Sequence, residues 1–213
     1  MEQLKIRFNK KKIKFAFWLT FIATFPAFLL SVSYDTLPDY ATNIAFAAGI
    51  IQLIGIVIYF TEFLPFLDDL TIDKNFTQRM LLYVSSISLL LKFVLQAASG
   101  LNKTNHIVFI NRDIVIGYIH LVTLGFVTCG LLFWLLSQRL IRIKSGFEIF
   151  GIHSFVTGFV ITEILLFIQV LNELLDLSKI PYRLILFIFS AVMLLGLITF
   201  WIAQFSHKDL RER

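Results

Sequence analysis

Six long apolar stretches dominate this chain and restrict the folds that are open to it. A helix that crosses a bilayer needs about 20 mostly apolar residues to cover a hydrocarbon core of about 30 Å. Turn-like or charged segments separate the six stretches, and the strict alternation of apolar and polar residues that is typical of membrane β-barrels is absent. The sequence therefore predicts an all-α, polytopic transmembrane helix bundle of about six spans, at residues 15–33, 44–67, 80–99, 114–136, 147–171 and 184–205.

The composition excludes an ordinary soluble domain. Of the 213 residues, 58% are hydrophobic and 15% are charged, whereas soluble domains carry about 25% charged residues. The single cysteine, Cys129, excludes an intramolecular disulfide and any zinc site built on paired cysteines. The expected domains are a basic cytoplasmic segment at 1–14, a six-helix transmembrane domain at 15–205 and a cytoplasmic tail at 206–213.

The lysines and arginines of the short loops predict the orientation of the chain, because these residues are enriched on the cytoplasmic side. With the N-terminus in the cytoplasm, 14 of the 19 basic residues lie on the inner side and four on the outer side. We therefore expect a multi-pass protein of the inner (plasma) membrane with both termini in the cytoplasm. The alternative is a cleaved signal peptide that ends at Ser31-Val32-Ser33.

Ionisable and amide side chains inside the apolar stretches are candidate functional residues, because charged groups are costly in the bilayer. A helical rise of about 1.5 Å per residue, counted from the predicted ends, places five of them in one layer in the outer half of the membrane. This predicted intramembrane polar site consists of Gln52, Lys92, Gln96, His120 and Glu163. His153 falls on the other side of the midplane, about 9 Å above the inner edge, and is a secondary candidate.

Structural roles compete with functional ones at these positions. An interhelical ion pair between Lys92 and Glu163 would neutralise two costly charges. The glutamines and His120 would otherwise hydrogen-bond to neighbouring helices. The sequence contains no phosphate-binding glycine loop, no nucleophile elbow and no His-Glu-x-x-His zinc motif. We therefore predict no catalytic residue.

The fourth apolar stretch carries a family resemblance. Residues 112–126, RDIVIGYIHLVTLGF, resemble a helix of proteins related to haem–copper oxidase subunit I and of the haem-and-copper membrane proteins linked to nitric-oxide stress. The segments GIIQLIG at 49–55 and KFVLQ at 92–96 are similar to bacterial membrane proteins of that group. The resemblance implies that His120 binds a cofactor, haem or copper, and that the chain corresponds to the C-terminal half of a longer protein. The His-x-His pairs of those families are absent, so full oxidase chemistry is not expected.

Three functions are compatible with these observations. The first is a haem- or metal-associated, oxidase-like membrane protein in which His120 is a ligand. The second is a small transporter or channel that uses the polar site in the outer half of the membrane. The third is a structural or assembly subunit whose polar residues serve helix packing. The expected partners are the lipid bilayer and another membrane protein or a second copy of the chain; nucleic acid is not expected, because the basic residues flank apolar helices.

Overall fold

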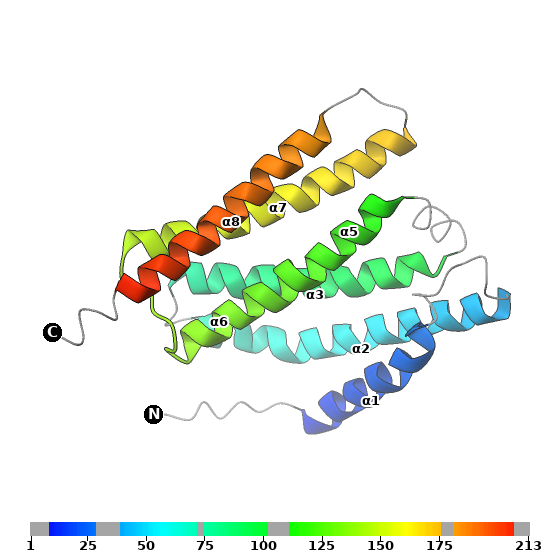
Figure 1. Ribbon diagram of the computed structural model, residues 1–213. Helices are drawn as coiled ribbons and strands as arrows, with labels where there is room; N and C mark the ends of the chain where they lie inside the picture. Colours follow the sequence, from blue (N-terminus) through cyan, green and yellow to red (C-terminus); the bar gives the residue numbers. More distant parts are fainter. Residues whose placement is uncertain (1–8, 29–38, 72–74, 102–110, 176–180, 207–213) are drawn as a thin grey trace. The chain divides into compact units, whose positions relative to one another are not determined.

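The computed structural model describes residues 9–28, 39–71, 75–101, 111–175 and 181–206. All regular secondary structure in these residues is helical (Figure 1). The π-helix η3 continues α5 and is continued by α6, so that the three form one uninterrupted rod. The elements are α1 (Lys10–Ala27), α2 (Asp39–Thr71), α3 (Phe76–Ser99), α5 (Arg112–His120), η3 (Leu121–Thr128), α6 (Cys129–Ser137), α7 (Gly146–Leu174) and α8 (Tyr182–Ser206).

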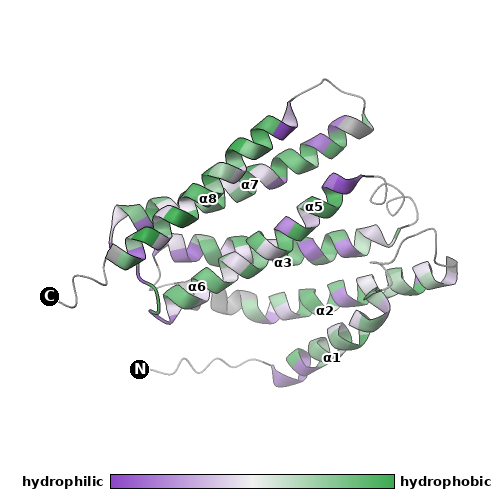
Figure 2. Ribbon diagram, in the orientation of Figure 1, coloured by the Kyte–Doolittle hydropathy of each residue, from purple (hydrophilic) through white to green (hydrophobic). Residues whose placement is uncertain are grey.

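Five helical segments among the described residues are long and apolar enough to cross a membrane. Hydrophobic residues cover most of the helices, whereas hydrophilic residues mark the starts of α1 and α5 (Figure 2). A helix suits this environment because it satisfies its backbone hydrogen bonds within itself where no water is present. These segments confirm the all-α membrane class and agree with the last five predicted spans: Tyr40–Phe63, Phe76–Ser99, Arg112–Ser137, Gly146–Asn172 and Tyr182–Phe205.

The first predicted span is described only in part. Helix α1 begins at Lys10, because Asn9 caps it by accepting the backbone N–H groups of Lys11 and Lys12 at 3.2 and 3.4 Å. Lysines that were expected to precede the first span therefore form the first turns of its helix. Several predicted features lie outside the described residues: the end of the first span with the cleavage site at 31–33, the tail beyond 206, and the basic residues at 5, 7, 74, 103, 179, 208, 211 and 213.

The chain divides into two compact units. Unit 1 comprises residues 1–74 and 89–112, and so contains α1, α2 and the second half of α3. Unit 2 comprises residues 75–88 and 113–213, and so contains the first half of α3 and all later helices. Helix α3 is therefore shared by the two units.

Small residues bring α1 and α2 into close contact in unit 1. Ala23 and Ala27 of α1 form a buried cluster with Ala48 of α2. Further along the same interface, a Cβ atom at Gly55 would lie 3.3 Å from the carbonyl oxygen of Ala16. Small side chains are the usual means of helix approach in membranes, because lipid tails provide no hydrophobic driving force between helices.

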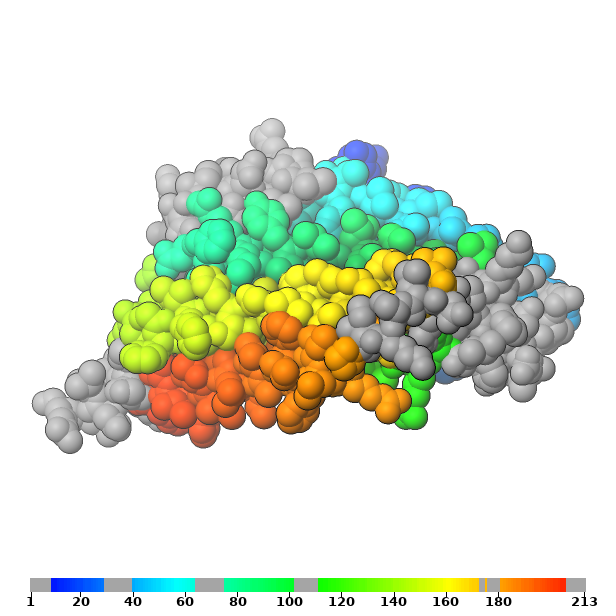
Figure 3. All heavy atoms as spheres, turned by 90° about the horizontal axis from the view of Figure 1, so that it is seen from above, coloured from blue at the N-terminus to red at the C-terminus, as the bar shows by residue number. Residues whose placement is uncertain are grey.

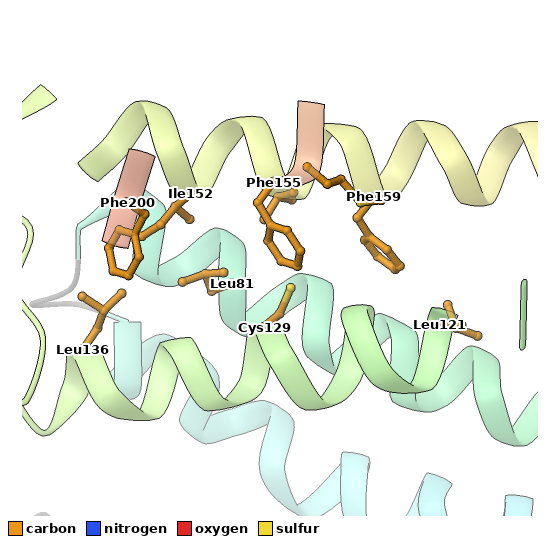
Figure 4. Packing of buried hydrophobic residues seen from close by; sticks show 10 residues of the cluster. Leu81, Leu121, Cys129, Leu136, Ile152, Phe155, Phe159 and Phe200 are labelled. Carbon is orange, nitrogen blue, oxygen red and sulfur yellow. The ribbon is translucent and has the colours of Figure 1, made fainter. Parts of the chain in front are cut away.

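Unit 2 has a larger apolar core. Figure 4 shows its side chains pointing toward one another from α3, the α5–η3–α6 rod, α7 and α8. Phe155 of α7 is 1% exposed, and the thiol of Cys129 is fully buried in the same cluster. This core holds together the helices that carry His120 and Glu163.

Helices α7 and α8 lie side by side along their length, as two views show (Figures 1 and 3). Their backbones approach closely at Gly151 of α7 and Gly196 of α8. A Cβ atom added to either glycine would lie 2.7 Å from the carbonyl oxygen of the other. Only glycine fits this crossing without moving one helix.

Candidate functional site

Unit 2 brings together His120 of α5 and Glu163 of α7, two members of the predicted polar site. His120 lies about 12 Å along its helix from Arg112, and Glu163 lies about 14 Å along its helix from Asn172. Because α5 and α7 run in opposite directions, these similar distances place both side chains at one level. That level lies well inside both candidate membrane spans.

The two side chains face each other at a distance slightly beyond a hydrogen bond. Nδ1 of His120 and Oε1 of Glu163 are 3.8 Å apart, and their side chains are 35% and 20% exposed. Both facing atoms are buried, and neither has a hydrogen-bond partner in the part of the chain that the structure describes. An unsatisfied buried polar group costs about 1–3 kcal/mol. A proton on either atom would turn this facing pair into a donor and an acceptor.

Glycine and a second polar pair extend the interface between α5 and α7. A Cβ atom at Gly117 would lie 3.8 Å from Oε2 of Glu163, an ordinary contact distance, so Gly117 packs next to the carboxylate. Towards the end where α5 begins, Nε2 of Gln169 donates to Oδ2 of Asp113 at 2.5 Å. The α5–α7 interface therefore carries polar groups from the end of the helices to the His120–Glu163 level.

The π-helix η3 begins directly after His120. Its wider turn appears in the side-chain bonding of Thr128, whose hydroxyl donates to the carbonyl oxygen of Thr123, five residues back, at 2.8 Å. Ser85 of α3 donates to the carbonyl oxygen of Phe126 at 2.9 Å. π-helical turns are rare in proteins overall, and where they occur they frequently lie at functional sites. The position of η3 directly after His120 therefore supports a functional role for this histidine.

Unit 1 holds the other three members of the predicted site in one hydrogen-bonded chain. Nζ of Lys92 donates to Oε1 of Gln96 at 2.6 Å, and Nε2 of Gln96 donates to Oε1 of Gln52 at 2.9 Å. Nε2 of Gln52 then donates to Oγ1 of Thr24 at 3.0 Å. This chain crosses from α3 through α2 to α1. Lys92 also lies over the ring of Phe93, with 3.8 Å from Nζ to the ring centroid.

The five residues of the predicted site form two clusters, one in each unit, and their common depth in the membrane stays a prediction. Gln52, Lys92 and Gln96 lie together in unit 1, and His120 and Glu163 lie together in unit 2. The expected ion pair between Lys92 and Glu163 joins residues of different units and stays a prediction.

His153, the secondary candidate, has contacts suited to packing. Its Nε2 lies 3.4 Å from Oγ1 of Thr77, and its ring meets that of Phe76 edge-on with centroids 5.9 Å apart. Both partners belong to the first turn of α3. A hydrogen bond to a neighbouring helix is the structural role that competes with a functional role at His153.

Three polar features of the structure were missed from the sequence. The carboxylate of Glu62 accepts a hydrogen bond from Nζ of Lys12 at 2.7 Å. Glu148 is fully buried and forms a capping box with Ser145 at the start of α7. The Ser-x-x-Glu pattern before an apolar run was the signal that could have found it. Nothing comparable in the sequence pointed to the partnership of Asp113 with Gln169.

The described residues offer few groups that could hold the haem or copper that the resemblance implies. Among the described residues, no group of three or more His, Cys, Asp or Glu side chains lies close enough to hold a metal ion. Copper and zinc sites are usually built from several such ligands. The resemblance offers His120 as a haem or copper ligand, and Glu163 is the described carboxylate that faces it.

Comparison with known proteins adds no family to this description. No protein-family model, no curated protein and no solved structure matches the chain. The resemblance of residues 112–126 to haem–copper proteins therefore stays a prediction.

Proposed function

We propose that this chain is a small proton-translocating membrane protein, a transporter or channel, that binds protons at His120 and Glu163. The observation that carries the proposal is the pairing of two ionisable side chains from two candidate spans, with their facing atoms buried and 3.8 Å apart. Ionisable groups at such depth are typical of proton relays and substrate pathways.

The surroundings of the pair support proton exchange over simple packing. A pair that served packing alone would gain most from a direct hydrogen bond, because buried polar groups without partners are destabilising. The separation instead leaves Nδ1 and Oε1 open to a proton. Asp113 and Gln169 add polar groups towards one end of the same interface. Through that end, protons would reach the pair.

Proton flux into vesicles tests the proposal. The full chain is reconstituted into liposomes that contain a pH-sensitive dye, and a membrane potential is imposed with potassium and valinomycin. We expect Glu163→Gln and His120→Gln to lower proton uptake at least tenfold while the detergent-purified proteins keep their helical content and elution volume. His153→Gln is the matched control, because His153 contacts only Thr77 and Phe76 among the interactions described above, and it should retain flux.

Two results would contradict proton translocation. If vesicles that contain the wild-type protein take up protons no faster than empty vesicles, the chain does not translocate protons. Equal proton flux in wild type and Glu163→Gln would show that Glu163 is not part of the proton-binding site. Destabilisation in both variants without any separable flux would favour the third function, a structural or assembly subunit.

A haem- or metal-associated role is the second candidate, and one observation favours it. Histidines that bind metals usually donate their other ring N–H to a carboxylate, and Glu163 lies next to Nδ1 of His120. A bound haem would supply redox chemistry, and His120 would hold it through its other nitrogen. The haem- or metal-associated role is tested with protein purified from haem-supplied cells. Its absorption spectrum is recorded before and after reduction with dithionite, and its metal content is measured on the same sample. A Soret band that His120→Ala removes supports the role, and a folded, colourless, metal-free protein contradicts it.

The location of the protein follows from the basic residues. We infer that both termini lie in the cytoplasm and that the chain resides in the inner (plasma) membrane. The inferred number of spans is six, with the predicted span at 15–33 as the first. The support is the excess of 14 inner over four outer lysines and arginines. A second copy of the chain or another membrane protein is the proposed partner within the bilayer. Labelling of cysteines introduced at each end, from either side of intact vesicles, tests the orientation.

A further inference from the structure

The polar chain of unit 1 has more hydrogen-bond donors than acceptors. An ammonium group carries three N–H donors and a glutamine amide carries two. Lys92 uses one donor on Gln96, Gln96 uses one on Gln52, and Gln52 uses one on Thr24. Each carbonyl oxygen in the chain already accepts a bond. Beyond these bonds, two N–H groups of Lys92 and one of each glutamine have no hydrogen-bond partner within the described part of unit 1.

The chain also carries a charge that nothing described in unit 1 balances. The carboxylate of Glu62 is held by Lys12 at 2.7 Å, and Glu62 lies about 15 Å along α2 from Gln52. Lys92 lies inside the candidate span Phe76–Ser99 and is half-buried. A cation in a membrane span is costly unless it has a partner. The two described partners of Lys92, the amide oxygen of Gln96 and the ring of Phe93, are both neutral.

We propose that Lys92, Gln96 and Gln52 form a binding site for a small monovalent anion. The ligand would accept the unused N–H groups and balance the single positive charge of Lys92. Gln52 is only 4% exposed, which limits the site to a compact ligand such as a halide ion or a short carboxylate. The three residues belong to unit 1, and the proposal does not depend on the proposed proton binding by His120 and Glu163.

Chloride binding tests the site directly. The probe is chloride, followed by the broadening of its NMR line when the detergent-purified full chain is added, with sodium gluconate holding the ionic strength constant. We expect saturable excess broadening with wild type and with Lys92→Arg, and its loss in Lys92→Met. Lys14→Met, which removes an exposed lysine of α1, is the matched control and should leave the broadening unchanged.

A second variant keeps the test decisive if Lys92→Met does not fold. Gln52→Glu places a carboxylate beside Gln96 with almost no change in shape, so it should supply the missing negative charge and abolish chloride binding. Displacement of chloride by acetate would assign the site to carboxylates as well, and no displacement would assign it to halides. No saturable broadening with wild type, or equal broadening with wild type and Gln52→Glu, would overturn the proposal.

Discussion

The crossing of α7 and α8 provides the sharpest test of the packing. In Gly151→Ala, the new methyl group would lie 2.7 Å from the carbonyl oxygen of Gly196 and 2.8 Å from the backbone nitrogen of Phe200. Ordinary contact begins at 3.4 Å, so the first distance is about 0.7 Å too short. Both atoms belong to backbone, so relief requires that α8 itself moves.

The expected cost follows from this geometry. Overpacking of a well-packed core costs about 1–3 kcal/mol, and alanine regains about 0.8–1 kcal/mol over glycine in helix propensity. Gly117→Ala is the matched control inside a span, because its methyl group would meet its nearest neighbour at an ordinary 3.7 Å. Both variants share the propensity gain, so the difference between them, about 1–3 kcal/mol, isolates the clash.

Modification of Cys129 by a thiol reagent measures this difference. Cys129 is fully buried in the core of unit 2, so its thiol reacts when that core opens. At about 1.4 kcal/mol per factor of ten, Gly151→Ala should react about 5 to 150 times faster than Gly117→Ala. The double variant Gly151→Ala/Gly196→Ala should lose less stability than the sum of the losses of the two single variants, because both changes force the same helices apart. Equal reaction rates for Gly151→Ala and Gly117→Ala would refute the close approach.

Three further changes should have separable effects on stability, each measurable by unfolding in mixed detergent. Glu148→Ala should cost about 1–3 kcal/mol, because Oε2 accepts the backbone N–H groups of Lys144 and Ser145 at 2.9 and 2.5 Å; no loss would show that the cap is unimportant. Gln52→Leu should cost about 0.5–1.5 kcal/mol and speed amide exchange in α1, and unchanged exchange would argue against its bond to α1. His153→Phe should change stability by less than about 1 kcal/mol, because its bond at 3.4 Å is long, and a larger loss would contradict a packing role.

The helices could be predicted from sequence because the signal for them is local. The predicted stretch 114–136 corresponds to the span Arg112–Ser137, and 80–99 corresponds to Phe76–Ser99. Length and hydropathy suffice for such segments, since lipid leaves the backbone no alternative to a helix. The start of α1 was missed because it depends on capping by Asn9, and lysine tolerates both helix and loop.

The partners of the polar residues were much harder to predict. Depth along each helix placed His120 and Glu163 at one level, and the structure brings their side chains to 3.8 Å. The same arithmetic put Gln52 and Gln96 at that level, and the two are hydrogen-bonded, whereas the further bond from Gln52 to Thr24 was not expected. Depth says nothing about how a helix is rotated or which helices are neighbours, and those properties come from packing across the whole chain.

The π-helix η3 bears on how the fourth span tolerates insertion and deletion. A π-turn holds one residue more than the α-turn it replaces, because its hydrogen bonds reach five residues along instead of four. Loss of a single residue between Leu121 and Thr128 would therefore restore α-helical bonding and leave both ends of the rod facing as before. In an ordinary transmembrane helix the same deletion would rotate every later side chain by about 100°. A chain shorter by one residue here would therefore keep the facing of the helix on both sides of η3, and His120 lies at the boundary of the affected segment.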